Sequence, residues 1–207
     1  MECLEFNDAP ITDAGLQELA GLKNLKHLTL NGDVVSGTGL RALVGLPRLT
    51  RLELMGTKVT DAGLKEVARF ANLTSLGTGG LQVTDAGLKE LTALKKLTFL
   101  VLVRTQVTDD VLKHLAALEK LEFLYLIAPN VTNAGVKKLA QMKSLASVYL
   151  YDTQMTDEGL LSLASLENLQ SLVLSGNKIT DPGINQLKIL LPKCSISNYE
   201  LNRRPVR

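Results

Sequence analysis

A nine-residue phrase that returns at a fixed interval constrains this chain more than any other feature. It reads VTDAGLKEV at residues 59–67 and VTDAGLKEL at residues 83–91. Its copies begin 24 residues apart, at Ile11, Val35, Val59, Val83, Val107, Val131, Met155 and Ile179. Because no insertion interrupts the series, each copy can stack on the next and bury a shared core. The period predicts one solenoid domain over residues 1–207, with a partial unit at 1–10 and a C-terminal tail at 197–207.

The hydrophobic spacing changes partway along one unit, residues 83–106. Leucines three apart, as on one face of a helix, occupy Leu88, Leu91 and Leu94. Further on, Leu100 and Leu102 alternate with other residues, as in a strand. Either Thr84 or Asp85 can cap the helix, since a short side-chain oxygen accepts a bond from a free N–H of the first turn. Each unit is therefore predicted to contribute one short helix and one strand.

Glycine recurs inside the predicted helices, although glycine there costs about 1 kcal/mol relative to alanine. The recurring positions are Gly15, Gly39, Gly63, Gly87, Gly135, Gly159 and Gly183. We interpret them as places where the backbones of neighbouring units approach so closely that a Cβ does not fit.

The second half of the unit carries a family resemblance. Residues 97–107, LTFLVLVRTQV, fit the pattern L-x-x-L-x-L-x-x-N-x-L, with Thr105 in the asparagine position. With the repeated TDAGLKxL phrase, the chain resembles bacterial leucine-rich repeat proteins of the ribonuclease-inhibitor-like and GALA-like classes. The resemblance covers residues 4 to about 196. It implies an α/β solenoid in a curved horseshoe arc, with a parallel β-sheet on the concave face, short helices on the convex face, and protein binding through the concave face.

Charge and hydropathy narrow the classes of partner. The net charge is only +2. Such a balance argues against binding to nucleic acid or to an anionic membrane surface, because both require a concentrated basic patch. No stretch approaches the roughly 18 uninterrupted apolar residues of a membrane span, and the opening MECLEFNDAPITD has no signal-peptide pattern. We expect a soluble chain of unknown compartment that binds no nucleic acid and inserts into no membrane.

Residues able to support catalysis or to hold a cofactor are scattered. His27 and His114 lie several units apart, and Cys3 and Cys194 stand at opposite ends of the chain. The GTGG stretch at residues 77–80 lacks the Lys-Ser/Thr that follows a phosphate-binding loop, and we interpret it as a locally weakened strand. We expect no enzymatic activity, no cofactor and no metal site.

Aspartate recurs just before the helices and raises the question of a metal site. It occupies Asp13, Asp61, Asp85, Asp109, Asp157 and Asp181. Such a row could bind ions along one edge of the solenoid, but a row of helix caps is the simpler interpretation.

Residues between the core leucines of each strand are predicted to form the concave face, because side chains alternate along a strand. This face is polar or small early in the chain, with Arg51 and Glu53 followed by Ser75 and Gly77. It then becomes aromatic and apolar, with Arg104 at its rim, at Phe99, Val101, Val103, Phe123, Tyr125, Ile127, Tyr149 and Tyr151. The chain has four tyrosines and four phenylalanines, and five of these eight residues gather on three neighbouring strands.

This concentration supports a non-enzymatic module that binds a protein partner on the concave face, since aromatic residues are enriched at binding hot spots. Strand propensity alone also favours aromatic and β-branched residues, so it is the competing explanation. Two other functions remain open. One is a structural or assembly spacer that self-associates through its termini, and the other is the targeting region of a larger effector or enzyme.

Overall fold

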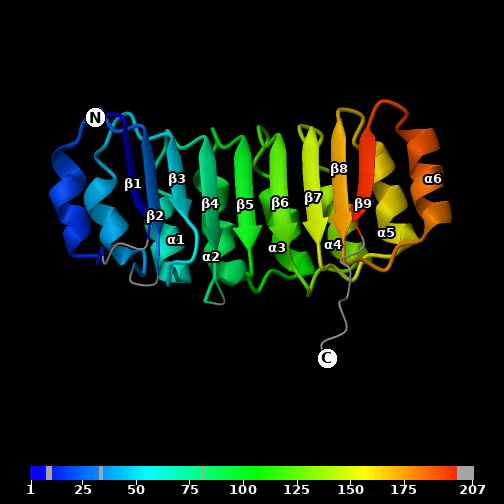
Figure 1. Cartoon of the computed structure of the whole chain (residues 1–207), viewed down its shortest axis with the longest axis horizontal. Helices are drawn as coiled ribbons and strands as arrows, with labels where there is room; N and C mark the ends of the chain where they lie inside the picture. Colours follow the sequence, from blue (N-terminus) through cyan, green and yellow to red (C-terminus); the bar gives the residue numbers. More distant parts are fainter. Residues whose placement is uncertain (8–10, 33–34, 81, 200–207) are drawn as a thin grey trace.

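Strands and helices alternate along the computed structural model, which describes residues 1–7, 11–32, 35–80 and 82–199. Parallel strands form one sheet in sequence order (Figure 1): β1 Cys3–Asn7, β2 His27–Asn31, β3 Arg51–Leu54, β4 Ser75–Gly79, β5 Phe99–Val103, β6 Phe123–Ile127, β7 Ser147–Tyr151, β8 Ser171–Ser175 and β9 Ser195–Tyr199. The last strand extends three residues into the segment predicted as a tail, and residues 200–207 lie outside the described residues.

The helices cover one face of the sheet. They are the 3₁₀ helices η1 Gly15–Gly21, η2 Thr38–Leu43, η3 Leu91–Ala93 and η4 Leu163–Ser165, and the α-helices α1 Asp61–Val67, α2 Asp85–Glu90, α3 Asp109–Leu115, α4 Asn133–Leu139, α5 Asp157–Ser162 and α6 Asp181–Leu190. In Figure 1 the row of helices extends beyond the sheet at both ends, so the strands line the shorter, inner side of the arc. The predicted α/β solenoid with a parallel sheet is confirmed.

Strand register follows the repeat. Each paired residue faces the residue 24 positions later, so Leu76 lies opposite Leu100 and Leu100 lies opposite Leu124. These leucines are fully buried and point toward the helices, where they meet the buried helix leucines in one continuous core. No single unit could bury this much apolar surface without its neighbours.

The threonine of the repeated phrase, rather than the aspartate, caps most helices. Thr84 accepts the N–H of Ala86 at the start of α2, and equivalent threonines cap α1, α3, α4 and α6. Asp85 instead reaches the next unit, where the Thr108 N–H donates to its Oδ1 at 3.0 Å and the Thr108 hydroxyl donates to its Oδ2. The interpretation of the aspartates as a row of caps was therefore wrong.

This contact repeats between units and forms what we call the aspartate–threonine ladder. Its members are the pairs Asp13–Ser36, Asp61–Thr84, Asp85–Thr108, Asp109–Thr132 and Asp157–Thr180. Two positions depart from it. Gly37 has no side chain to take part. Asn133 accepts the Thr156 N–H through its Oδ1 but donates its amide to the Thr156 hydroxyl, and α5 has no side-chain cap.

The recurring helix glycines fit against this ladder. A Cβ built on Gly87 would overlap Asp61 Oδ1 and lie 2.7 Å from Asp61 Cα. Gly135 and Gly183 stand in the same relation to Asp109 and Asp157. The predicted close approach of backbones is confirmed at Gly39, Gly63 and Gly87, where a Cβ would lie within 2.7 Å of a backbone atom of the preceding unit. At Gly135 and Gly183 the nearest atoms belong to an aspartate side chain, and at Gly15 the nearest, Thr12 Oγ1, would be 3.8 Å away, so the prediction was wrong for Gly15. Where the contact is close, it explains why glycine is kept despite its helix cost.

Candidate protein-binding face

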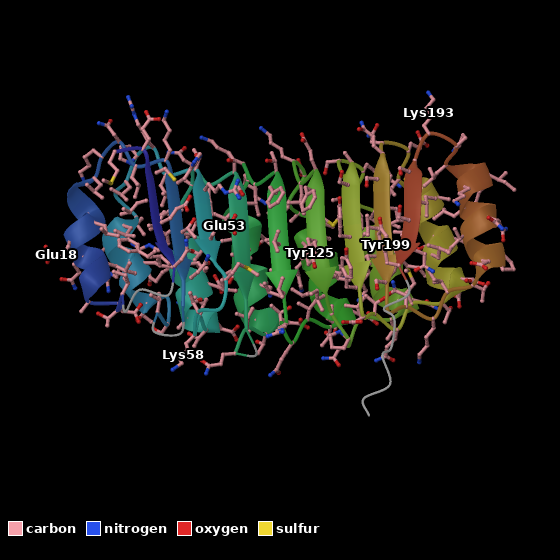
Figure 2. All side chains as sticks on the ribbon, viewed as in Figure 1. Glu18, Glu53, Lys58, Tyr125, Lys193 and Tyr199 are labelled. Carbon is pink, nitrogen blue, oxygen red and sulfur yellow. The ribbon has the colours of Figure 1, made fainter. Side chains whose placement is uncertain are left out.

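The sheet face opposite the helices carries the residues predicted to bind a partner. In β5, Leu100 and Leu102 are buried against the helices, while the alternate side chains Phe99, Val101 and Val103 are only partly buried on the other face. The same alternation holds in β6 and β7. Figure 2 shows the labelled side chains of Glu53, Tyr125 and Tyr199 over this inner face.

Parallel pairing brings the aromatic residues of β5, β6 and β7 together. Register places Phe99 opposite Phe123, and Tyr125 opposite Tyr149. The rings of Phe99 and Phe123 stack with centroids 4.2 Å apart and planes inclined by 8°. Tyr149 lies 5.2 Å from Phe123 and 5.9 Å from Tyr125, and Tyr151 lies 5.0 Å from Tyr125, all between ring centroids. We call this connected group of five rings the aromatic ladder.

Three aliphatic residues complete the apolar surface. Val101 and Val103 of β5 and Ile127 of β6 are partly buried beside the rings. Ile127 lies opposite Tyr151 in the sheet register. The structure therefore brings together all eight aromatic and aliphatic residues predicted for this face.

A further aromatic residue on this face was missed from the sequence. Tyr199 ends β9, two strands beyond Tyr151 in the same row of the sheet, and its side chain is 60% exposed. It lies near enough to affect Tyr151, whose pKa is raised first by burial and then by the neighbouring phenols of Tyr125, Tyr149 and Tyr199. The 24-residue period could have found it, because Tyr199 is two periods after Tyr151.

Arg104 lies at the rim, where it follows β5 and is exposed. Its φ of 54° is left-handed, as is that of Asp152 after β7. Glycines with positive φ, Gly56 and Gly176, occupy the equivalent turn in other units. Two charged residues of opposite sign thus flank the aromatic ladder in a conformation that is uncommon for side chains other than glycine.

Arg51 and Glu53 lie apart from the aromatic ladder, on β3. Their side chains pair, with 3.1 Å between Arg51 Nη2 and Glu53 Oε1. Glu53 lies over Gly77 of β4, where a Cβ would overlap its carboxylate. Burial raises the pKa of Glu53, and the neighbouring Arg51 guanidinium opposes that rise. The predicted binding residues therefore form an aromatic patch and a separate ion pair, with β4 between them.

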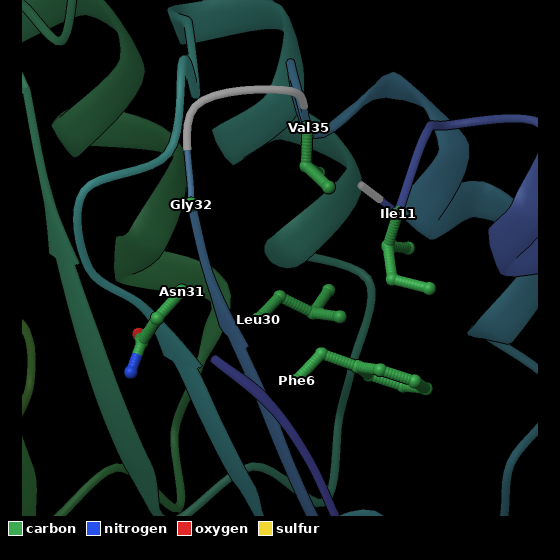
Figure 3. A pocket seen from close by; sticks show the side chains of 6 residues that line it. All are labelled: Phe6, Ile11, Leu30, Asn31, Gly32 and Val35. Atoms are coloured by element: carbon green, nitrogen blue, oxygen red, sulfur yellow. The ribbon is translucent and has the colours of Figure 1, made fainter. Parts of the chain in front are cut away.

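Outside this face, the described residues form no grouping typical of a catalytic or metal site. His27 and His114 are exposed on β2 and α3. Within the described residues, no three His, Cys, Asp or Glu side chains are grouped closely enough to hold a metal ion. Figure 3 shows a hollow lined by Phe6, Ile11 and Leu30, among others, whose volume of about 10 Å³ holds at most one water. None of the helices in the described ranges is long and apolar enough to cross a membrane.

Comparison with known proteins agrees with this architecture. A family model described as leucine-rich repeat matches residues 46–68 and 165–186. No curated protein sequence matches the chain significantly. Among solved structures, internalin C2 of Listeria monocytogenes is 26% identical with a TM-score of 0.73, and the match covers 95% of this chain and 80% of the internalin.

Two further structures share the fold. A second internalin of L. monocytogenes is 23% identical with a TM-score of 0.56, over 96% of this chain and 67% of its own. A leucine-rich repeat protein of Leptospira interrogans is 22% identical with a TM-score of 0.56, over 94% of this chain and 60% of its own. The chain folds as a leucine-rich repeat solenoid, and its similarities support a leucine-rich repeat protein of the bacterial type.

Proposed function

We propose that the chain is a non-enzymatic interaction module that binds a protein partner on the inner face of its sheet, through the aromatic ladder. The observation that carries this proposal is the grouping of five rings on three adjacent strands, all partly exposed. Aromatic side chains supply large contact area with few rotatable bonds, and they dominate the energetics of many interfaces.

The contrast with neighbouring strands supports the proposal over strand propensity. If propensity alone set these positions, aromatic residues would be spread along the sheet. The equivalent positions of β2 carry His27, Thr29 and Asn31, and those of β8 carry Ser171, Val173 and Ser175. The aromatic ladder is therefore local, as a binding site for one partner would be.

The proposal also draws on the protein class. Leucine-rich repeat folds generally mediate protein–protein interaction, and this chain has that fold over nearly its whole length. Assignment to the ribonuclease-inhibitor-like or GALA-like class stays a prediction.

Affinity capture from a native lysate of the source cells, followed by mass spectrometry, tests the proposal. The bait is the wild-type chain, compared with a Phe123→Ser, Tyr125→Ser, Tyr149→Ser variant and with a control, Lys89→Ser, Lys113→Ser, on the exposed helix side. We expect a protein retained by the wild type and by the control but lost with the aromatic variant. Equal recovery by all three folded baits would overturn the proposal.

Association through the ends is a second candidate, favoured by a specific observation. Ile189 and Leu190 at the end of α6 are 78% and 51% exposed, and Tyr199 on the last strand is also exposed. Large exposed apolar residues beside a sheet edge favour contact with another chain. Light scattering across a hundredfold concentration range tests it, and a constant monomer mass would count against it.

A further inference from the structure

Two exposed charges of opposite sign flank the aromatic ladder at one edge of the sheet. Arg104 directly follows β5 and Asp152 directly follows β7, so the two residues hold equivalent positions two units apart. Within the described ranges, neither side chain forms a hydrogen bond or an ion pair. The equivalent residue after β6 is Ala128, which is buried and uncharged. This edge therefore presents a positive charge at one end of the aromatic ladder and a negative charge at the other.

The backbone at both residues indicates that these side chains serve more than the fold. Their φ angles of 54° lie in the left-handed region, which glycine occupies at lower cost. Glycine with positive φ does occupy the equivalent position in other units, at Gly32, Gly56, Gly80 and Gly176. In the part of the chain that the structure describes, the non-glycine residues with positive φ are Arg104 and Asp152 alone. Strain of this kind is typical of positions where a side chain takes part in function.

Hydroxyl groups of the aromatic ladder also lack partners. No hydrogen bond joins the phenols of Tyr125, Tyr149 or Tyr151 to another described residue. The rings stack on one another, and the three side chains are only partly buried. A partner that covers these rings must supply hydrogen-bond acceptors for the phenols, because a buried hydroxyl without a partner is unfavourable.

The spacing of the two charges selects a backbone conformation for that partner. Two strand spacings, about 10 Å, separate β5 from β7. A polyproline II segment has about three residues per turn and rises about 9 Å per turn, so its residues i and i+3 point the same way at nearly that distance. Its carbonyls form no internal hydrogen bonds and are free to accept from the phenols. In a β-strand, by contrast, residues i and i+3 point to opposite sides.

We propose that the partner contributes a proline-rich segment in the polyproline II conformation, which crosses β5, β6 and β7 on the aromatic ladder. The inference rests on the proposed function. An acidic residue of the segment contacts Arg104, and a basic residue one turn away contacts Asp152. The prolines between them pack on Tyr125, Tyr149 and the neighbouring rings. Proline-rich segments bind aromatic surfaces at little cost in chain entropy, because their conformation is already formed.

Other occupants fit this surface less well. A helix presents residues i and i+7 about 10 Å apart, but its carbonyls are bonded within the helix and leave the phenols without acceptors. A segment with charges of a single sign would be repelled by either Arg104 or Asp152. Charge complementarity therefore selects a segment that carries both signs, one turn apart.

A displayed library of random 12-residue peptides provides the probe. It is selected against the wild-type chain, with the aromatic triple-serine variant of the capture experiment used to remove peptides that bind elsewhere. Selected peptides are synthesised, and fluorescence polarisation measures their affinities for wild type, Arg104→Gln and Asp152→Asn. Glu122→Gln is the matched control, because Glu122 is exposed at the opposite edge of the aromatic ladder, directly before β6. Circular dichroism checks that each variant is folded.

We expect the selected peptides to share prolines between an acidic and a basic residue. Alanine in place of those prolines weakens binding about tenfold, because the free peptide is then less ordered. Arg104→Gln weakens binding about threefold, and it abolishes the effect of replacing the acidic residue of the peptide with glutamine. Asp152→Asn acts in the same way on the basic residue, whereas Glu122→Gln changes neither.

Two results would overturn this inference and leave the proposed function standing. One is a set of ladder-dependent peptides that lack proline or that bind Arg104→Gln or Asp152→Asn unchanged. The other is a partner captured from the lysate through the aromatic ladder when the library provides no ladder-dependent peptide. If neither the lysate nor the library provides a ligand that needs the aromatic ladder, both proposals fail.

Arg104→Gly and Asp152→Gly provide a second route to the same site. Glycine already occupies this turn at Gly56 and Gly176, so both variants relieve the left-handed backbone and should remain folded. We expect each variant to lose affinity for the selected peptides while its urea midpoint stays close to the wild-type value. Unchanged affinity in both folded variants would overturn the inference.

Discussion

Two ladders run across the repeats of this molecule, and they follow different rules. The aspartate–threonine ladder lies beside the helix starts and recurs at five of the junctions described, with the repeated glycine packed against it. The aromatic ladder lies on the opposite face and occupies only β5, β6 and β7. Both join neighbouring units, but only the first recurs along most of the described chain.

This difference separates what stacking requires from what it permits. Every junction needs a way to satisfy backbone donors where two units meet, so an aspartate paired with a threonine or serine returns at five of the junctions described. Side chains on the inner face contribute less to the core and are free to vary. The aromatic ladder is confined to three strands, so stacking of the units does not require it. The two ladders should therefore respond differently to mutation.

The largest effect is expected from a glycine that packs on the aspartate–threonine ladder. In Gly87→Ala the new Cβ overlaps Asp61 Oδ1 and approaches the Asp61 backbone, which a side-chain rotation does not relieve. We expect a loss of about 1–3 kcal/mol in the free energy of unfolding, as for overpacked sites. Urea denaturation followed by circular dichroism measures it.

Gly15→Ala is the matched control, since Gly15 holds the same place in the first unit. Its Cβ would come no closer than 3.8 Å to Thr12 Oγ1. We expect no loss there and a small gain from helix propensity. Equal losses at both positions would show that the glycines are not kept for close approach.

Removing one carboxylate from the aspartate–threonine ladder should cost somewhat less. Asp85→Ala leaves the N–H and hydroxyl of Thr108 without their acceptor. We expect a loss of about 1–2 kcal/mol in unfolding free energy, by the same denaturation measurement.

A graded variant sharpens this prediction. Asp85→Asn copies the arrangement that the chain already tolerates at Asn133, where the amide donates to the threonine hydroxyl. We expect less than half the loss seen with alanine. A larger loss with asparagine than with alanine would contradict the proposed role of the acceptor.

The sequence predicts the repeating framework of the solenoid well, but neither ladder in full. A constant period implies register, core leucines and close glycine contacts, because these depend on the repeat alone. The aspartates were misassigned because the sequence does not show that Asp85 and Thr108, 23 residues apart, lie in contact. Alternation placed Phe99 and Tyr125 on the inner face. Their stacking geometry, and the position of Glu53 over Gly77, depend on rotamers that no pattern specifies.

A smaller stability effect is expected on the aromatic ladder. Phe123→Ala removes the ring that contacts both Phe99 and Tyr149. Because the ring is partly exposed, we expect a loss of about 1 kcal/mol, within the range for aromatic pairs. Thr29→Ala, on the polar part of the same face, serves as the control and should be close to neutral. A loss at Phe123 above that of Gly87→Ala would make the aromatic ladder chiefly structural.

Dependence on pH offers a further distinction, beginning with Asp13 of the aspartate–threonine ladder. Burial acts to raise its pKa, but bonds from the Ser36 hydroxyl and from the N–H groups of Gly39, Ser36 and Gly37 outweigh burial and lower it. A lowered folded-state pKa stabilises the protein above the unfolded value of about 3.9, and this contribution is lost as pH falls through the folded value. We expect Asp13→Asn to lose less stability than wild type between pH 5 and pH 2, measured by thermal unfolding.

Glu53, on the inner face of β3, should show the opposite pH dependence and the smallest effect. Burial raises its pKa despite Arg51, so the folded protein holds the Glu53 proton more tightly than the unfolded chain does. Stability from this group is present below the unfolded pKa of about 4.3 and is lost as pH rises through the folded pKa. Glu53→Gln cannot ionise, so its stability relative to wild type should rise from pH 4 to pH 7 in urea denaturation. A stability difference that stays constant from pH 4 to pH 7 would contradict the raised pKa of Glu53.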